Sequence, residues 1–452
     1  MRASISSVVI LASLAAGAFA CHSAPPAPPP PPRVLNDSES AAVRWVEAHA
    51  APFDTSDSVA SAAERAQLVA FAGNARVFGF SELTEGTHQF PYIVRRTLFA
   101  LAESGRARGL AIQGPMPEAM EVDRYVRGGP GDPQRLLRAL GSWRWDTREM
   151  RALVEAMRVW NRGRQPSQQI GFYGFEIPSA EHAVHVIEAL HDSVVGAPLK
   201  AWLTRQYACV AVNEGAHWGL EGRAADSSYW NACGPATSAA LDSIVALRQR
   251  LGGASASPDL AFAEQMARLV QHHVRTSLRH LKREELNAEH VLYLADQLGP
   301  DAMLMLWGGD VEMGRLTLEK TTVQTGVPLG RQLGDRYRAV AFAFGTGVVR
   351  TRPAMAGLRG GGEPGLSDVP VREIIPDSYE DILGRATPEG YWLDVRALPA
   401  DAAGQWLRGP RAMRLVTEVY ASAAPQAFQA TVELPANFDA VVFAKRVTAA
   451  KQ

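Results

Sequence analysis

Two carboxylates and a histidine, each three residues from the next, follow an apolar run. The run covers residues 76–80, and Glu82, Glu85 and His88 come directly after it in the segment SELTEGTHQF. A short apolar run of this kind is typical of a strand that is buried on both faces. Carboxylates and imidazoles are the groups that proteins use to move protons or to hold metal ions. The segment is therefore a candidate reactive site at the end of a strand.

Further apolar runs along the chain predict a sheet that could position these groups. They cover residues 109–113, 169–175, 303–307, 339–344 and 440–443. Between them lie amphipathic stretches in which apolar residues recur every three or four positions, as in helices. This alternation predicts an α/β fold with a central, mostly parallel sheet flanked by helices. The spacing of apolar residues over 179–289 is mostly that of helices, and it predicts a helical subdomain over the C-terminal strand ends. The strand at 303 must return to the same sheet, so no separate domain is expected.

In a parallel sheet the carboxyl ends of the strands meet at one edge, where ligands bind. Polar residues stand at each of these ends in the sequence: Ser81, Glu82, Glu85 and His88, then Gln113, Glu176, Asp310 and Glu312, and finally Thr346. The acids among them are more numerous than helix capping requires. We therefore expect Glu82, Glu85, His88, Asp310 and Glu312 to form one catalytic group.

Three kinds of chemistry are conceivable for this group. Ser81 could act as a nucleophile, but the sequence around it lacks the second glycine of a nucleophile elbow. Metal binding could recruit the acids and His88, although no recognised ligand spacing is present. The third is activation of water by a carboxylate, because acids crowded in one cleft raise one another's pKa and leave one of them poised as a base.

The chain resembles the erythromycin esterase family, whose members add water to the ester of a macrolactone ring. The family's Gly-Glu-x-Thr-His-Gly motif after a strand is similar to the segment 81–86. Other similar blocks are Tyr-Val-Arg-Gly-Gly at 125–129, Trp-Arg-Trp-Asp-Thr-Arg-Glu at 143–149 and Phe-Tyr-Gly-Phe-Glu at 172–176. The likeness covers residues 45–447. It implies an α/β hydrolase. Gln113, Trp143, Trp145 and Glu176 are candidate substrate-binding residues; the alternatives are that the tryptophans pack structurally and that Glu176 caps the next turn.

The chain departs from the family at the residues that carry the chemistry. The motif histidine, taken as the group that activates water, corresponds to Glu85, and an acid after the second strand corresponds to Gln113. Two histidines after the fourth strand correspond to Gly309 and Glu312, with Asp310 in place of an asparagine. An arginine early in the first helix of many members corresponds to His88. Glu82 alone is unchanged in the carried-over catalytic set.

These substitutions leave a site made mainly of acids. Unit charges about 4 Å apart repel by several kcal/mol at an intermediate dielectric constant, so the acids must share protons, pair with His88 or an arginine, or hold a cation. One hypothesis is an ester or lactone hydrolase without a cofactor, in which Glu85 is the base, Glu82 positions water and His88 stabilises the oxyanion or protonates the leaving group. The alternatives are a catalytically silent small-molecule-binding protein and a site for a divalent cation.

The N-terminal residues predict export. Arg2 precedes an apolar run that ends at Ala18-Phe19-Ala20, which is typical of a signal peptide over residues 1–20. A proline-rich tether is expected over 21–40, before an esterase-like domain over 41–450. Cys21 could carry a lipid anchor, giving a periplasmic or membrane-anchored protein, or the chain could be secreted without it. In an oxidising compartment Cys209 and Cys233 can pair as a disulfide, although two buried thiols are also possible.

Charge argues against some classes of partner. The chain has 46 Lys and Arg residues against 47 Asp and Glu residues, with no long run of one sign. A protein that binds nucleic acid or an anionic membrane surface normally has a basic patch or excess. We therefore expect a small-molecule ester as the partner, no nucleic acid, and a membrane only through Cys21.

Overall fold

The computed structural model describes residues 33–56, 59–178, 180–190, 192–211, 227–253, 257–277, 282–316, 324–354 and 365–452. Residues Asn36–Gln452 form one compact unit. The expected signal peptide and Cys21 lie outside the described residues. Helix α1 (Asp37–His49) begins within the range expected for the tether, because Asn36 and Glu39 form a capping box at its first turn.

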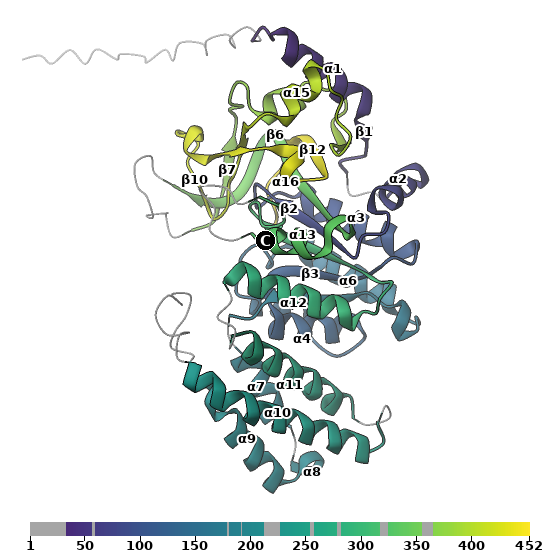
Figure 1. Ribbon diagram of the computed structural model, residues 1–452, viewed down its shortest axis with the longest axis vertical. Coiled ribbons are helices and arrows are strands. Elements are labelled where there is room, and N and C mark those ends of the chain that lie inside the picture. Colours follow the sequence, from purple (N-terminus) through teal and green to yellow (C-terminus); the bar gives the residue numbers. More distant parts are fainter. Residues whose placement is uncertain are drawn as a thin grey trace, which may run out of the picture. The chain divides into compact units, whose positions relative to one another are not determined.

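One large sheet runs through this unit (Figure 1). Its strands are ordered β1-β8-β12-β6-β2-β5-β3-β4. They are β1 (Ala51–Pro52), β2 (Val77–Glu82), β3 (Ala107–Pro115), β4 (Gly171–Glu176), β5 (Met303–Gly309), β6 (Tyr337–Pro353), β8 (Gly390–Asp394) and β12 (Ala440–Val447). The six strands from β12 to β4 pair in parallel. Strand β8 pairs antiparallel with β12, and β1 pairs antiparallel with β8. The α/β prediction is confirmed, and each of the six expected strands is present.

Smaller strands extend the sheet beside the long strand β6. They are β7 (Ser367–Val371), which is antiparallel to β6, and β10 (Val419–Tyr420), which is parallel to it. A separate pair is formed by β9 (Arg411–Arg414) and β11 (Gln429–Val432). Near them lie the short helices α14 (Tyr379–Leu383), α15 (Ala402–Arg408) and α16 (Leu434–Asn437).

Large apolar side chains cover one face of the sheet. Phe78, Phe80, Trp307 and Phe342 alternate along β2, β5 and β6 and belong to one buried cluster. Successive residues of a strand point to opposite faces, so this alternation gives a single apolar face. The helices whose residues join the cluster are α2 (Ala62–Ala72), α3 (Gln89–Glu103), α4 (Met116–Val126), α5 (Pro133–Ala139) and α6 (Arg148–Asn161).

The opposite face carries Gly79 and Gly308, which let side chains of the segment after β5 approach the sheet closely. A Cβ on Gly79 would lie 2.9 Å from Met313, and a Cβ on Gly308 would lie 2.9 Å from Glu312. The segment after β5 therefore folds back across this face, which is also covered by α12 (Arg283–Gln297) and α13 (Gly326–Leu333).

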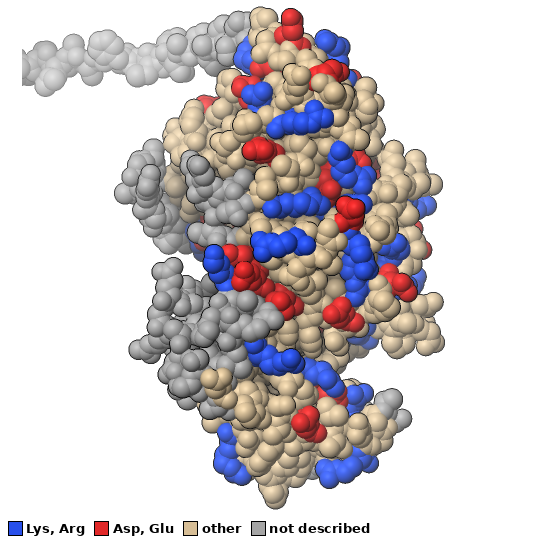
Figure 2. Space-filling view, in the orientation of Figure 1, with Lys and Arg blue, Asp and Glu red and all other residues tan. Residues whose placement is uncertain are grey.

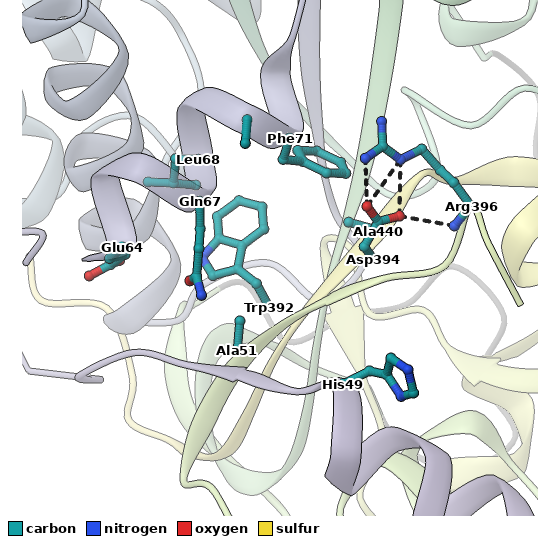
Figure 3. A pocket seen from close by; sticks show the side chains of 11 residues that line it. His49, Ala51, Glu64, Gln67, Leu68, Phe71, Trp392, Asp394, Arg396 and Ala440 are labelled. Atoms are coloured by element: carbon teal, nitrogen blue, oxygen red, sulfur yellow. Dashed lines mark hydrogen bonds and ion pairs between the residues drawn. The ribbon is translucent and has the colours of Figure 1, made fainter. Parts of the chain in front are cut away.

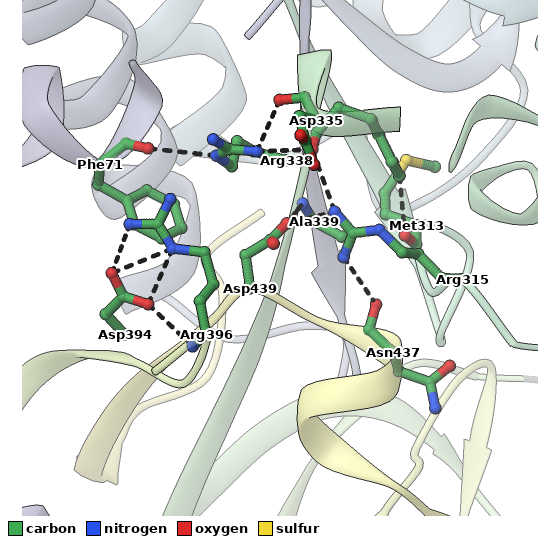
Figure 4. A network of polar contacts seen from close by, with 11 residues as sticks. Phe71, Met313, Arg315, Asp335, Arg338, Ala339, Asp394, Arg396, Asn437 and Asp439 are labelled. Atoms are coloured by element: carbon green, nitrogen blue, oxygen red, sulfur yellow. Dashed lines mark hydrogen bonds and ion pairs between the residues drawn. The ribbon is translucent and has the colours of Figure 1, made fainter. Parts of the chain in front are cut away.

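A polar network fixes the far end of that segment (Figure 4). Arg315 donates to the backbone oxygen of Tyr337 at 3.0 Å and to the carboxylate of Asp439. Asp439 also accepts from the backbone N–H of Ala339 at 2.8 Å. The segment after β5 is thus tied to the beginnings of β6 and β12, which limits how residues 310–315 can move.

Five helices between β4 and α12 form a layer of their own. They are α7 (Glu181–Glu188), α8 (Asp192–Val195), α9 (Ala197–Ala211), α10 (Ser227–Arg250) and α11 (Pro258–Ser277). Within this layer α7 and α11 pack against α4, and α11 also contacts α12 (Figure 1). The Cys209–Cys233 disulfide joins α9 to α10, which confirms the expected pairing.

Lys and Arg alternate with Asp and Glu over the face of the molecule drawn in Figure 2.

Among the described helices, none is long and apolar enough to cross a membrane.

Candidate active site

The loop between β2 and α3 holds Glu85 in a fixed position. The Glu85 N–H donates to the backbone oxygen of Val416 at 2.9 Å, and the Gly86 oxygen accepts from the N–H groups of Arg350 and Ala450. Gly86 has a φ of 81°, and a Cβ there would lie 2.0 Å from the Arg350 oxygen. Only glycine fits such an approach, so the glycine makes this anchoring possible.

Glu85 and Arg144 form an ion pair directly beside Gly309. Arg144 Nη1 lies 3.2 Å from Glu85 Oε1, and their side chains are 13% and 4% exposed. A Cβ on Gly309 would lie only 1.8 Å from Glu85 Oε1 and 2.7 Å from Arg144 Nη2. The pair therefore fills the volume that a side chain at position 309 would need.

Burial raises the pKa values of the carboxyl groups near this pair. The pKa of Glu85 is raised to about 7, mainly because burial disfavours the charged form, and Arg144 opposes that rise. The pKa of Glu82 is raised to about 8 for the same reason. Its Oε2 accepts from Trp307 Nε1 at 3.0 Å. Both carboxyl groups therefore hold a proton more readily near neutral pH than an ordinary glutamate does.

Asp310 belongs to the same group but has an unusual backbone. Its φ is 53°, in the left-handed region, and its Oδ1 accepts from the Val311 N–H at 2.7 Å. Burial raises its pKa, whereas Arg144 lowers it. A non-glycine residue in this conformation is uncommon and often marks a functional site.

Two tryptophans and Gln113 form the frame around the ion pair. Trp145 Nε1 donates to the Gln113 backbone oxygen at 3.2 Å, and its ring meets Trp307 edge to face at 5.2 Å. The Gln113 side chain accepts from the Gly309 N–H at 2.9 Å. The Arg144 guanidinium lies 4.7 Å from the centre of the Trp145 ring. These contacts hold Arg144 and Gly309 in one rigid arrangement.

Glu312 lies on the other face of the sheet from Glu85. It packs against the Gly308 position, whereas Glu85 packs against the Gly309 position, and neighbouring residues of a strand face opposite ways. Glu312 Oε1 accepts from the Thr325 hydroxyl, and burial raises the pKa of Glu312 to about 7. The acids thus form a group of three around Arg144 with Glu312 separate.

Ser81 and His88 are engaged elsewhere. Ser81 Oγ accepts from the Met313 N–H at 2.9 Å, on the same face as Glu312. His88 Nδ1 lies 2.6 Å from Glu149 Oε1, and Glu149 also accepts from the Lys451 N–H. His88 therefore links the beginnings of α3 and α6.

A cleft of about 910 Å³ opens at the carboxyl ends of β3 and β4. Gln113, Trp143, Arg144, Trp145 and Glu176 line it, so the structure brings the four expected substrate-binding residues together. Glu176 pairs with Arg283 in this wall. Further lining comes from α7, with Glu181, His182 and His185. Of the ion pair, Arg144 lines the cleft, whereas Glu85 is not one of the lining residues.

A second cavity, of about 300 Å³, lies between α2 and the antiparallel strand β8 (Figure 3). Trp392, Leu68 and Phe71 form its apolar wall, and the paired Asp394 and Arg396 close one side. Ala440, the first residue of β12, also lines it. It thus lies toward the amino ends of the parallel strands, away from the acids.

The part of the chain that the structure describes contains no group of three or more His, Cys, Asp or Glu side chains placed to hold a metal ion. The separation of Glu312 from Glu85 and the cation of Arg144 are physical reasons for this. A like charge at the centre of a carboxylate group opposes the binding of a second cation.

Sequence reasoning did not select Arg144. It lies between Trp143 and Trp145, some sixty residues from Glu85 along the chain. The need for a cation among buried acids was a signal, but the sequence contains many arginines and did not indicate which one pairs.

The comparisons with known proteins agree with the fold. A crystal structure of a Bacillus cereus protein matches with a TM-score of 0.72 and 18% identity, covering 92% of this chain and 99% of the other. The structure of a succinoglycan biosynthesis protein matches with a TM-score of 0.71 and 15% identity over 92% and 100%. A mutant erythromycin esterase in its open conformation matches with a TM-score of 0.55 and 15% identity over 88% and 97%.

The sequence model of the erythromycin esterase family matches residues 107–447, which is most of the chain. The similar blocks at 125–129, 143–149 and 172–176 lie within this range, whereas the segment 81–86 precedes it. The chain belongs to the erythromycin esterase family.

Proposed function

We propose that the protein hydrolyses a carboxylic ester or lactone and that Glu85 is the general base. The observation that carries this proposal is the state of the Glu85 carboxylate. Its Oε1 is paired with Arg144, while Oε2 is buried and has no hydrogen-bond partner among the described residues. A buried acceptor of this kind needs a partner, and a water molecule at Oε2 would provide it.

The reaction adds one water to one ester. The water oxygen attacks the carbonyl carbon while Glu85 Oε2 takes its proton, and the carbonyl oxygen becomes an oxyanion. When the C–O bond to the alcohol breaks, the leaving oxygen receives a proton, so the products are an acid and an alcohol. A base with a pKa near the working pH is best suited to this step, and the pKa of Glu85 is about 7.

Glu82 supports the base without competing with it. Burial raises its pKa, so it keeps its proton more readily than an ordinary carboxyl group. A neutral carboxylic acid can position the water or return a proton to the leaving group. His88 remains a predicted participant; its contact with Glu149 supports a role in orienting the start of α3.

The cleft supports a small-molecule ester as the substrate, macrolide-related esters among them. Its volume is within the range of about 300–1,000 Å³ that is usual for ligand sites, and the partly exposed Trp143 offers apolar surface. No cofactor is required by this mechanism. The disulfide supports export, because disulfides persist in oxidising compartments; lipidation at Cys21 stays a prediction.

The test is hydrolysis of a panel of simple esters, lactones and macrolides in ¹⁸O-labelled water, followed by mass spectrometry. We expect the wild type to place one labelled oxygen in the acid product. Glu85→Gln should lower kcat by a factor of about 10²–10⁴, the usual contribution of a general base.

Glu103→Gln is the matched control, because this glutamate lies at the exposed end of α3. It should retain wild-type turnover. Equal turnover by wild type and Glu85→Gln would remove Glu85 as the base. Saturable ligand binding without any labelled product would favour the silent binding protein, and loss of turnover on chelation would favour the divalent-cation site.

A further inference from the structure

Arg144 has hydrogen-bonding capacity that the described structure does not use. Nη1 faces Glu85, but Nε and Nη2 are buried and have no acceptor among the described residues. Leaving buried charged donors without acceptors costs more than the roughly 1–3 kcal/mol of a neutral group. Such donors in a native site are explained when a ligand supplies the acceptor.

The position of Arg144 suits a ligand in the cleft. The residue lines the cleft wall, and its side chain is only 13% exposed. Its guanidinium stacks near Trp145, which is itself fixed by Gln113 and Trp307. Donors held in place before the reaction do not have to reorganise when charge develops, and this is the basis of oxyanion stabilisation.

The charges around Arg144 also support a role in binding a negatively charged oxygen. Arg144 lowers the pKa values of Glu82, Glu85 and Asp310, so it lies within the field of all three acids. During hydrolysis Glu85 gains a proton and becomes neutral while the carbonyl oxygen becomes negative. Arg144 would thus exchange one anionic partner for another, and the buried site would keep its net charge throughout the step.

We propose that Arg144 is a catalytic residue that donates from Nε and Nη2 to the carbonyl oxygen of the substrate as it becomes an oxyanion. This inference rests on the proposed hydrolase function and adds the group that stabilises the transition state. It also names the chemistry recognised at this point of the cleft: a planar ester or lactone carbonyl, and afterwards the carboxylate of the product.

The test compares Arg144→Gln, Arg144→Lys and Arg144→Ala with Arg138→Gln. Arg138 is the matched control because its side chain is 65% exposed and pairs with Asp146 on the surface. For the hydrolysed ester, Arg144→Gln should lower kcat about 10²–10³-fold with a much smaller change in KM, as expected for loss of an oxyanion donor. Arg144→Lys should restore only part of the loss, since lysine cannot reproduce the planar fork.

Two further readouts separate catalysis from a structural role. Millimolar guanidinium should restore part of the activity of Arg144→Ala, and not of Glu85→Gln. Removing the cation should also raise the pKa of Glu85, so the rising limb of the pH–rate profile of Arg144→Gln should move to higher pH. Rates that are unchanged in Arg144→Gln would overturn the inference, as would losses that guanidinium cannot rescue and that follow a fall in thermal stability.

Binding of an aryl methylphosphonate monoester anion, which mimics the tetrahedral intermediate, separates this inference from the proposed function. Calorimetry should show binding by the wild type and by Arg138→Gln, and at least about tenfold weaker binding by Arg144→Gln. Binding that depends on Arg144 without hydrolysis would overturn the hydrolase proposal and, with it, the catalytic role of Arg144, and would leave Arg144 as an anion-binding residue. Hydrolysis with binding that does not depend on Arg144 would overturn this inference only, and neither binding nor hydrolysis would overturn both.

Discussion

Gly309 has no side chain, and the space beside its Cα is occupied by the Glu85 carboxylate and the Arg144 guanidinium. The family resemblance places a histidine at this position and another at position 85. In this chain glutamate stands at position 85, and glycine at 309 leaves the Glu85–Arg144 ion pair its volume. Positions 85 and 309 are therefore physically linked through one site.

The variant Gly309→Ala tests this link. The new Cβ would lie 1.8 Å from Glu85 Oε1, so the carboxylate must move away from Arg144. We expect kcat/KM to fall at least about tenfold and the free energy of unfolding to fall by about 1–3 kcal/mol, as for other overpacked sites. Enzyme kinetics and urea unfolding measure the two effects.

Gly365→Ala is the control for Gly309→Ala. Among the described residues, no atom lies within 4 Å of a Cβ at position 365, so activity and stability should stay at wild-type values. If Gly309→Ala had the activity and stability of this control, a side chain at 309 would not displace the ion pair. The proposed link between positions 85 and 309 would then be wrong.

The pH dependence of the rate is a second prediction for single residues. The base must be ionised to accept a proton, and the pKa of Glu85 is about 7. We therefore expect kcat/KM to rise about tenfold per pH unit below 7 and to level off above it. A profile measured from pH 5 to 9 checks this expectation, and a flat profile down to pH 5 would contradict it.

The loops after β2 and β5 show how elements position these residues. Backbone hydrogen bonds from Val416, Arg350 and Ala450 hold the first loop, and the second folds back along the sheet face that Gly79 and Gly308 leave open. Sequence reasoning placed Glu82, Glu85, Asp310 and Glu312 at strand ends. It could not predict that the chain crosses to the other face between Asp310 and Glu312, because this depends on which residues of a neighbouring strand are glycine.

The disulfide gives a prediction for the helical layer. It joins α9 to α10 across a sequence separation of 24 residues. Replacing both cysteines by alanine should lower the free energy of unfolding by roughly 3 kcal/mol, because the unfolded chain is no longer constrained. Urea unfolding of the oxidised wild type and of the double variant measures this difference.

Neither cysteine lines the cleft, so turnover of the double variant at low temperature should match the wild type. Adding a reductant should destabilise the wild type and leave the variant unchanged. A double variant as stable as the oxidised wild type would show that the disulfide adds nothing to the folded state.

The stability of the whole molecule should depend on its buried acids. Burial raises the pKa of Glu82 to about 8 and those of Glu85 and Glu312 to about 7, above the ordinary value of 4.5. Between these values the folded state binds more protons than the unfolded state, so stability falls as pH rises. The contribution of these three acids to the free energy of unfolding is fully present below about pH 4.5. It is lost between about pH 4.5 and 8, at up to about 1.4 kcal/mol per pH unit for each acid.

Urea unfolding of wild type and Glu82→Gln at several pH values between 5 and 8 tests this dependence. Glutamine keeps an acceptor for Trp307 and has no charge to bury, so the variant should gain stability relative to the wild type as pH rises. A difference between the two proteins that does not change with pH would mean that Glu82 has an ordinary pKa in the folded state.

The sequence by itself determined the α/β class, the six parallel strands and the strand ends at which polar residues gather, because these follow from local periodicity and from the rule that ligands bind at carboxyl ends. It also indicated the family and a site rich in acids. The tertiary structure decided which of those acids meet: Glu82, Glu85 and Asp310 surround Arg144, whereas Glu312 lies across the sheet and His88 joins Glu149. Partners such as Arg144 and Gly309 are far from Glu85 along the chain, and their contact depends on packing, which local patterns do not encode.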